Sequence, residues 1–141
     1  GPLNMSHIVL KGMAERRFGR VVNIASDAGR VGSSGEAVYS ACKGGMIAFT
    51  KTVARELVSK GIIVNTICPG YIETTRLEKV FASSGKDPNV MRDELVAQVP
   101  MGRIGSVEDI ASLVALLVSP RGNYLTGTTI QVDGGLLRHV R

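Results

Sequence analysis

Three short apolar segments predict the strands of a parallel sheet. They cover residues 21–25, 62–67 and 128–132, and each is rich in β-branched side chains. The first two are apolar almost without interruption, which is typical of strands whose two faces are both covered by helices. We therefore expect a sheet that is packed between layers of helix.

A long helix is predicted between the first two strands. Apolar side chains recur there at steps of three and four residues, which places them along one side of a helix. They are Val38, Cys42, Met46, Phe49, Val53 and Leu57. Gly61 follows at the position of a left-handed C-terminal cap, directly before the second strand. The order strand, helix, strand predicts an α/β fold.

The route to the third strand is longer and contains further helices. Residues 83–89 are rich in Ser, Gly, Asp and Pro, which predicts a loop between short helices, with residues 90–99 forming the helix after it. Ser106, with Asp109 three residues later, has the pattern of a capping box and predicts the start of another helix. The buried face of that helix is expected to carry Ile110, Leu113, Val114 and Leu117. The expected architecture is a partial Rossmann-like parallel sheet of three strands with flanking helices.

Composition narrows the possible classes of protein. The chain has 141 residues, of which 44% are hydrophobic and 21% charged, so we expect one ordinary globular domain. No apolar run approaches the roughly 18 residues that a membrane span needs, and no signal segment opens the sequence. We therefore expect a cytoplasmic protein with no membrane partner. Residues 1–4, before Met5, are interpreted as the remnant of a purification tag and are left out of the fold prediction.

The net charge of +5 raises the question of nucleic-acid binding. Lysines and arginines are scattered, aromatic residues make up only 4%, and there is no tryptophan, so the sequence offers no surface for stacking bases. The densest basic runs, residues 15–17 and 138–141, are interpreted as solvated segments. We expect no nucleic-acid partner.

The cysteines and histidines do not predict a metal site. Cys42 and Cys68 are expected to be free, buried thiols. His7 and His139 lie at opposite ends of the chain, so no group has the spacing of metal ligands.

Tyr39 and Lys43 are the first candidates for chemistry, because a spacing of four residues places both on one side of the predicted helix. A cation about 4 Å from a phenol favours the phenolate by roughly 4 kcal/mol at an effective dielectric near 20. A tyrosine in that position is able to exchange protons near neutral pH. Ser26 ends the first strand, at the edge where open α/β sheets bind ligands, and its hydroxyl could hold a substrate oxygen against the tyrosine. The plainer alternative is a flexible loop that leads into an amphipathic helix.

The loop between Ser26 and Tyr39 is rich in glycine. Gly29, Gly32 and Gly35 allow the chain to turn from strand to helix without filling the cleft. They do not form G-x-G-x-x-G, so we do not expect a dinucleotide-phosphate loop at this position.

Three further polar residues are interpreted as structural. Asn23 is expected to bond to a neighbouring loop, and Asp133 is expected to fix the last turn. Glu36 is interpreted as a favourable charge at the start of a helix.

Four motifs in order resemble the C-terminal half of a classical short-chain dehydrogenase/reductase. They are residues 23–26 (NIAS), Tyr39-x-x-x-Lys43, residues 69–74 (PGYIET) and residues 132–135 (VDGG). On this resemblance, residues 5–141 form the catalytic half of such a domain. Within the family, residues 26–45 are most similar to dehydrogenases of alicyclic hydroxyacyl-CoA thioesters.

The resemblance implies a role for each motif residue. Tyr39 is similar to the family's acid/base, Lys43 to the residue that keeps it acidic and contacts the ribose, and Ser26 to the ligand of the substrate oxygen. The residues Pro69, Gly70, Ile72 and Thr74 resemble the loop on the nicotinamide side. The implied activity is an NAD- or NADP-dependent interconversion of a secondary alcohol and a ketone, without a metal.

The family's nucleotide-binding half, which precedes these motifs, is not found in the sequence. We therefore expect a truncated chain that binds the cofactor weakly and is inactive alone. Three alternatives stay open: a part of a longer enzyme, a non-catalytic oligomerisation module, and a chain whose missing half comes from a separate polypeptide. In the family's strand order the first strand would lack a neighbour, so we also expect a homo-oligomer that covers its edge.

Overall fold

Three parallel strands form the sheet of the computed structural model, which describes residues 1–137. They are β1 (Gly19–Ile24), β2 (Ile62–Pro69) and β3 (Thr129–Val132), hydrogen-bonded in the order β1-β2-β3. Val21 lies opposite Val64 in the first ladder, and Ile67 lies opposite Ile130 in the second. Because all three strands point the same way, their carboxyl ends meet at one edge of the sheet. The predicted α/β fold class is confirmed.

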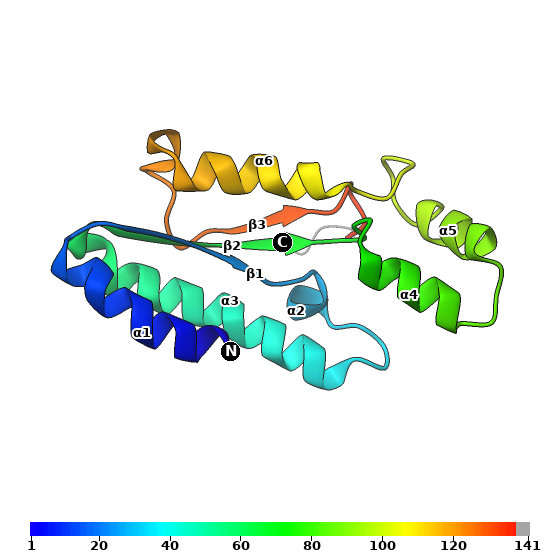
Figure 1. Ribbon diagram of the computed structural model, residues 1–141, viewed down its shortest axis with the longest axis horizontal. Helices are drawn as coiled ribbons and strands as arrows, with labels where there is room; N and C mark the ends of the chain where they lie inside the picture. The colour runs from blue at the N-terminus through cyan, green and yellow to red at the C-terminus, as the bar shows by residue number, and fades with distance from the viewer. Residues whose placement is uncertain (138–141) are drawn as a thin grey trace.

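Helices cover both faces of this sheet (Figure 1). The helices α1 (Pro2–Glu15) and α3 (Ala37–Leu57) lie on one face, and α6 (Val107–Val118) lies on the other. The remaining elements are α2 (Ala28–Val31), the 3-10 turn η1 (Val58–Lys60), α4 (Thr75–Ser83), α5 (Pro88–Val96) and the 3-10 turn η2 (Pro120–Gly122). Figure 1 shows α2, α4 and α5 beyond the carboxyl ends of the strands.

The middle strand carries the core. All of residues 62–68 are buried, including the polar Asn65 and Thr66, as the nearly continuous apolar pattern predicted. Ile62 and Val64 form a cluster with Val53 and Ala54 of α3, and Leu10 of α1 packs against it. Burial of one such aliphatic side chain contributes about 1.5–3 kcal/mol, so β2 is the best-anchored element of the sheet.

The apolar stripe predicted for α3 is covered by the rest of the protein only in the second half of the helix. Val53 is buried, but Val38 is 80% exposed and Cys42 is exposed as well. The first turns of α3 run past the end of β1, where the sheet no longer covers them (Figure 1). Cys42 and Cys68 are free as predicted, but only Cys68 is buried, so the prediction of a buried Cys42 thiol is wrong.

The predicted helix ends agree better with the structure. Gly61 has a φ of +74°, and a side chain there would place a Cβ 2.3 Å from the Arg17 carbonyl oxygen, so this left-handed turn requires glycine. Ser106 and Asp109 form the reciprocal capping box of α6. Arg103 also donates to both Asp109 carboxylate oxygens at 2.7 and 3.0 Å. This pairing, with the Ser106 N–H, lowers the pKa of Asp109 far below its ordinary value.

The sequence prediction omitted α1 and α2. The helix α1 begins at Pro2, inside the segment interpreted as a tag remnant, and Ser6 is its one buried residue. The basic run 138–141, with His139, lies outside the described residues. Within residues 1–137, no helix is long and apolar enough to cross a membrane, and no three acidic, cysteine or histidine side chains gather as metal ligands would.

Candidate active site

A hollow of about 550 Å³ opens at the carboxyl ends of β1 and β2. Its wall includes every residue that the sequence singled out for catalysis or cofactor binding: Ser26, Tyr39, Lys43, Pro69, Gly70, Ile72 and Thr74. The apolar face of α6, with Val107, Ile110 and Val114, closes the other side. The structure therefore brings together residues that are far apart in the sequence.

Ser26 stands directly after β1, and the local backbone orients its hydroxyl. Its Oγ accepts the N–H of Ala28 at 3.2 Å, while its carbonyl accepts the N–H of Gly29 at 3.0 Å. Since the oxygen is already an acceptor, the hydroxyl proton is available for donation to another oxygen. Ser26 is thus built as a hydrogen-bond donor at the rim of the hollow.

Tyr39 and Lys43 come from successive turns of α3 and reach the same hollow. The Lys43 ammonium donates to the Ile24 carbonyl at 2.8 Å, which fixes it at the end of β1. It lies 5.6 Å from the centre of the Tyr39 ring, and the guanidinium of Arg76 lies 5.8 Å from the same centre. Two cations therefore face this tyrosine. The sequence analysis missed Arg76, because it comes from α4 and no spacing relates it to Tyr39.

Gly29 sets the distance between α2 and α3. A Cβ on Gly29 would lie 2.6 Å from the carbonyl carbon of Lys43 and 2.8 Å from the nitrogen of Gly44. The absence of a side chain lets the Ser26 turn pack directly against the helix backbone that carries Lys43. Gly32 and Gly35 have φ values of +81° and +77°, which side chains rarely allow, so these two glycines help the chain to turn from strand to helix as expected.

The loop of residues 69–74 is tied to the sheet and to the start of α6. The N–H of Gly70 donates to the Val132 carbonyl at 3.0 Å, and Ile72 forms a β-bridge with Gly105. Thr74 caps α4, because its Oγ1 accepts the N–H of Leu77 at 3.3 Å. The loop is therefore held on three sides and presents Ile72 and Thr74 to the hollow.

One of the structural interpretations is wrong and one is confirmed. Asn23 donates from its amide to the Thr50 hydroxyl at 2.8 Å, so its partner belongs to helix α3 and not to a loop. The Thr50 side chain is fully buried, and its hydroxyl also accepts a hydrogen bond from Thr66 at 2.7 Å. One hydroxyl of α3 therefore binds a polar side chain from each of two neighbouring strands. Asp133 does fix the last turn, since it accepts the N–H groups of Gly135 and Leu137 at 3.0 and 2.8 Å.

Asp27 is a second residue that the sequence analysis missed. It follows Ser26 directly, is only 6% exposed, and lines a neighbouring hollow of about 640 Å³ that Ser26 and Tyr39 also border. Burial raises the pKa of Asp27 to about 7, the nearby Asp133 adds to this rise, and Arg30 opposes it. The neighbouring hollow continues beneath α4 and α5, where its apolar wall contains Leu77, Val80, Phe81, Met91 and Leu95.

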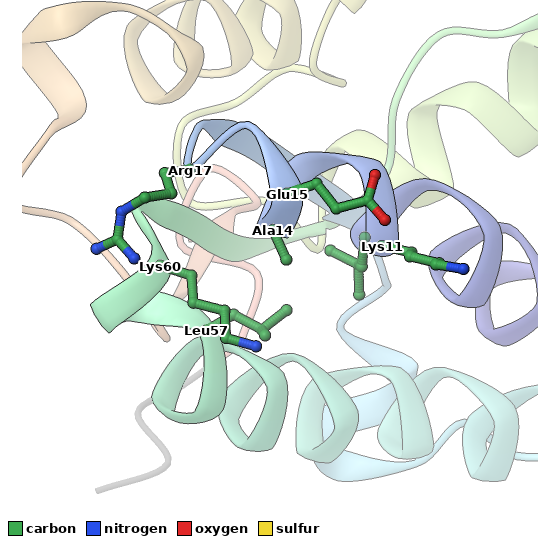
Figure 2. A pocket seen from close by; sticks show the side chains of 7 residues that line it. Lys11, Ala14, Glu15, Arg17, Leu57 and Lys60 are labelled. Atoms are coloured by element: carbon green, nitrogen blue, oxygen red, sulfur yellow. The ribbon is translucent and has the colours of Figure 1, made fainter.

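A third hollow lies elsewhere and contains none of these residues. It has a volume of about 490 Å³ and lies between the end of α1 and the end of α3, as Figure 2 shows. Leu57 and Ala14 form its apolar part, and Lys11, Arg17 and Lys60 stand around it. Arg17 lies two residues before the start of β1, and Lys60 lies two residues before the start of β2, so this hollow is at the opposite edge of the sheet from Tyr39.

Comparison with known proteins agrees with this geometry. A family model described as enoyl-(acyl carrier protein) reductase matches residues 1–137. The chain belongs to the short-chain dehydrogenase/reductase family. Among curated members of the family, the 3-oxoacyl-[acyl-carrier-protein] reductase FabG of Vibrio cholerae is 44% identical over 132 residues, or 94% of this chain and 51% of that protein. The acetoacetyl-CoA reductase of Shinella zoogloeoides is 43% identical over 135 residues, or 96% of this chain and 54% of that protein.

A solved structure gives the same arrangement of elements. The crystal structure described as ribose-5-phosphate isomerase from Brucella melitensis 16M superposes with a TM-score of 0.84 at 36% sequence identity. The superposition covers 93% of this chain and 49% of that one. Family membership and the Rossmann-like fold are thus confirmed. The chain spans about half the length of the curated relatives it matches.

Proposed function

We propose that the whole protein is an NAD- or NADP-dependent oxidoreductase of the cytoplasm, which interconverts a secondary alcohol and a ketone on an acyl thioester. The observation that carries this proposal is the single hollow lined by Ser26, Tyr39 and Lys43 together with the loop of residues 69–74. A serine hydroxyl, a tyrosine phenol and a lysine ammonium at one hollow support a site that binds a substrate oxygen and exchanges its proton.

Each of the three residues has a distinct role in the proposed reaction. A nicotinamide cofactor, when bound, would supply or accept the hydride at the carbon that changes oxidation state. Ser26 donates its hydroxyl proton to the substrate oxygen and holds it in place. Tyr39 gives a proton to that oxygen in reduction and takes one from it in oxidation. Lys43 stabilises the phenolate form by its charge, from the position fixed by the Ile24 carbonyl.

The second hollow supports an acyl thioester as the substrate. Ser26 and Tyr39 border it, and its far wall is the apolar surface of α4 and α5. An acyl or alicyclic group would bury apolar area there while its oxygen faced the two hydroxyls. The curated relatives are named for 3-oxoacyl and acetoacetyl thioesters, and the resemblance of residues 26–45 to dehydrogenases of alicyclic hydroxyacyl-CoA points to the same substrate class.

The residues present fit only one end of the cofactor. Tyr39, Lys43 and the loop of residues 69–74 line a hollow large enough for the nicotinamide and its ribose. Within residues 1–137, the glycine-rich loop between β1 and α3 lacks the G-x-G-x-x-G pattern of a turn that holds a pyrophosphate. Tight binding of the dinucleotide therefore needs the half of the domain that this chain does not supply.

Substitution of Tyr39 tests the proposed chemistry. In the full-length protein that contains this sequence, Tyr39→Phe should abolish the oxidation of NADH or NADPH by acetoacetyl-CoA. The substitution removes the hydroxyl that is proposed to exchange the proton with the substrate oxygen. Tyr124→Phe is the matched control, since Tyr124 is fully exposed and lines none of the three hollows. If Tyr39→Phe retains more than a few per cent of the rate, the proposed role of Tyr39 is wrong.

A non-catalytic role in oligomerisation is the second candidate, and the surface of α1 favours it. Leu3, Met5 and Ile8 are 60%, 61% and 69% exposed, which is unusual for large apolar side chains on one helix. We propose that a second copy covers this surface. Light scattering that shows a monomer at micromolar concentration would contradict this.

A separate polypeptide is the third candidate, as the source of the missing half. Within residues 1–137, β1 pairs with β2 alone, so its outer edge is open to a further strand. Such a partner should co-purify with the chain from its native source, and its absence from that preparation would count against this candidate.

A further inference from the structure

Within residues 1–137, no hydrogen-bond donor reaches the carboxylate of Asp27. Asp27 stands at the first position before α2, but its carboxylate does not cap that helix. It is 94% buried, and within residues 1–137 neither Oδ1 nor Oδ2 accepts a hydrogen bond. An ionised carboxylate in such a place is costly, so the group needs either a proton or a partner.

The group that faces Asp27 is a second carboxylate, that of Asp133. Gly70 lies against both: a Cβ built on it would be 2.7 Å from the Asp133 Cβ and 3.4 Å from Asp27 Oδ2. The lack of a side chain at Gly70 is what lets the end of β1 approach the turn after β3 this closely. Two ionised carboxylates repel each other, so the pair is stable when it holds one proton between them.

Asp27 is the member that holds this proton. Burial raises the pKa of Asp133 as well, but the N–H groups of Leu137 and Gly135 and the amide of Gln131 outweigh it and keep that pKa low. Asp27 lacks such donors, and its pKa is raised to about 7 by burial and by Asp133. With a proton on Asp27, its O–H donates to the Asp133 carboxylate, which gives one of the two unsatisfied Asp27 oxygens a partner.

We propose that Asp27 is a positioning residue of the active site, which holds the Ser26 turn to the end of β3 through one proton shared with Asp133. The role as a site residue rests on the proposed function, because Ser26 is the group that is positioned. The proton sharing itself does not depend on that function, because it rests on the burial of Asp27 and on the packing of both carboxyl groups against Gly70.

The bonds around the pair show why it would position Ser26. The Asp27 N–H donates to the Pro69 carbonyl at 3.2 Å, so the turn after Ser26 already contacts the loop of residues 69–74. Arg30 of α2 donates to Gln131 Oε1 at 2.5 Å, and the Gln131 amide donates to Asp133. The Asp27–Asp133 contact completes this link between α2 and β3, and the same Asp133 holds Leu137 in the wall of the hollow.

Loss of the proton would loosen this link. The ionisable groups near Asp27 are Asp133, Arg30 and the Cys68 thiol, and Arg30 is the one cation among them. Arg30 lowers the pKa of Asp27, but burial and the Asp133 carboxylate outweigh it, so this one cation does not compensate for the second negative charge. Above about pH 7, Asp27 and Asp133 are both charged, and we expect the Ser26 turn to move away from β3.

The test is a carbon-13 NMR titration of the aspartate side chains in the 141-residue chain, from about pH 4 to about pH 9. One carboxyl carbon should titrate with a midpoint near 7 and disappear in Asp27→Asn. The backbone N–H signals of Ser26 and Gly29 should shift with the same midpoint. In Asp133→Asn, the midpoint of Asp27 should fall by about one pH unit or more, because the repelling charge is gone.

Asp27→Asn also supplies the rescue. Its amide donates to Asp133 at every pH, so the signals of Ser26 and Gly29 should no longer depend on pH in this range. Asp93→Asn, on the exposed side of α5, is the matched control and should leave the titration unchanged. The proposal is overturned if no carboxyl titrates above about pH 6, if the midpoint survives Asp27→Asn, or if the Ser26 signals stay still while Asp27 titrates.

These outcomes are separate from the proposed oxidoreductase function. The titration needs neither cofactor nor turnover, and Tyr39→Phe should leave it intact. If the chain shows the titration of Asp27 but Tyr39→Phe leaves the parent protein active, the shared proton is supported and the proposed role of Tyr39 is wrong.

Discussion

Replacement of Gly29 by alanine tests how the Ser26 turn and the Lys43 helix are held together. Gly29 lies in α2 with a φ outside the left-handed region, so backbone conformation alone would favour alanine by about 0.5–1 kcal/mol. The added Cβ would instead stand 2.6 and 2.8 Å from backbone atoms of Lys43 and Gly44. Backbone inside a helix cannot turn aside as a side-chain tip can, so the two helices must separate.

The expected magnitude follows from these two terms. Overpacking of this kind costs about 1–3 kcal/mol. After the helix preference is subtracted, we expect Gly29→Ala to lower the free energy of unfolding by up to about 2.5 kcal/mol. Gly45→Ala is the matched control, because it lies on α3, meets no atom within 4 Å, and should stabilise the chain by about 0.5–1 kcal/mol.

Urea unfolding of the three chains measures both effects. With a slope of about 1–3 kcal/mol per molar urea, the midpoints of the two variants should differ by about 1 M, with the unsubstituted chain between them. A Gly29→Ala midpoint equal to that of Gly45→Ala would refute the inference that this contact sets the distance between α2 and α3.

Four further outcomes are expected. The pKa of Asp27 is about 7 in the folded chain and 3.8 in the unfolded chain, so the stability that its proton contributes is complete below pH 3.8 and is lost as the pH rises to 7. Thermal unfolding should show a loss of at most about 4 kcal/mol between these two pH values, and Asp27→Asn should not show it. Gly70→Ala should destabilise the chain by about 1–3 kcal/mol in urea, because its Cβ meets Asp133, and an unchanged midpoint would contradict this. Ser106→Ala should cost about 1 kcal/mol through loss of the α6 cap, visible as a lower thermal midpoint. Calorimetry with NADH or NADPH should give a dissociation constant of about 1 mM or weaker for the chain alone, since a few hydrogen bonds do not offset the lost freedom of the ligand; micromolar binding would show a cofactor site that the hollow does not reveal.

The sheet was predictable because its strands are marked by composition. Residues 62–67 were predicted as a strand, and β2 extends from Ile62 to Pro69. The prediction was possible because both faces of this strand are buried and its apolar run is interrupted only by Asn65 and Thr66. The start of α6 was predictable for a different reason. The capping box of Ser106 and Asp109 is a local motif, so its residues satisfy each other whatever packs around them.

The elements that escaped prediction are those whose environment lies elsewhere in the chain. The helix α1 exposes most of its apolar side chains, so it has little of the periodicity that marks a buried face. Val38 has the right spacing for the α3 stripe, but spacing does not tell where the sheet ends. The partners of Asn23 and Asp27 are on other elements, at Thr50 and Asp133, and no local pattern announces either contact.

The candidate site was predictable as a set of residues but not as a shape. The resemblance selected Ser26, Tyr39, Lys43 and the loop of residues 69–74, and all of them border one hollow. The second cation at Arg76 and the apolar wall under α4 and α5 became visible only when the chain was folded. The positions of Arg76 and of this apolar wall depend on how far beyond the sheet the loop of residues 69–74 places α4.

The strand order has a consequence for how the chain opens. Within residues 1–137, β2 has a neighbour on each side, whereas β1 has one neighbour and an outer edge without a strand. The amide protons of β1 that point away from β2 should therefore exchange with deuterium first, by local fraying. Those of β2 should exchange last, because its residues 62–68 are buried and only global unfolding exposes them. A strand docked on the outer edge of β1 would slow the first group by orders of magnitude and leave the second almost unchanged.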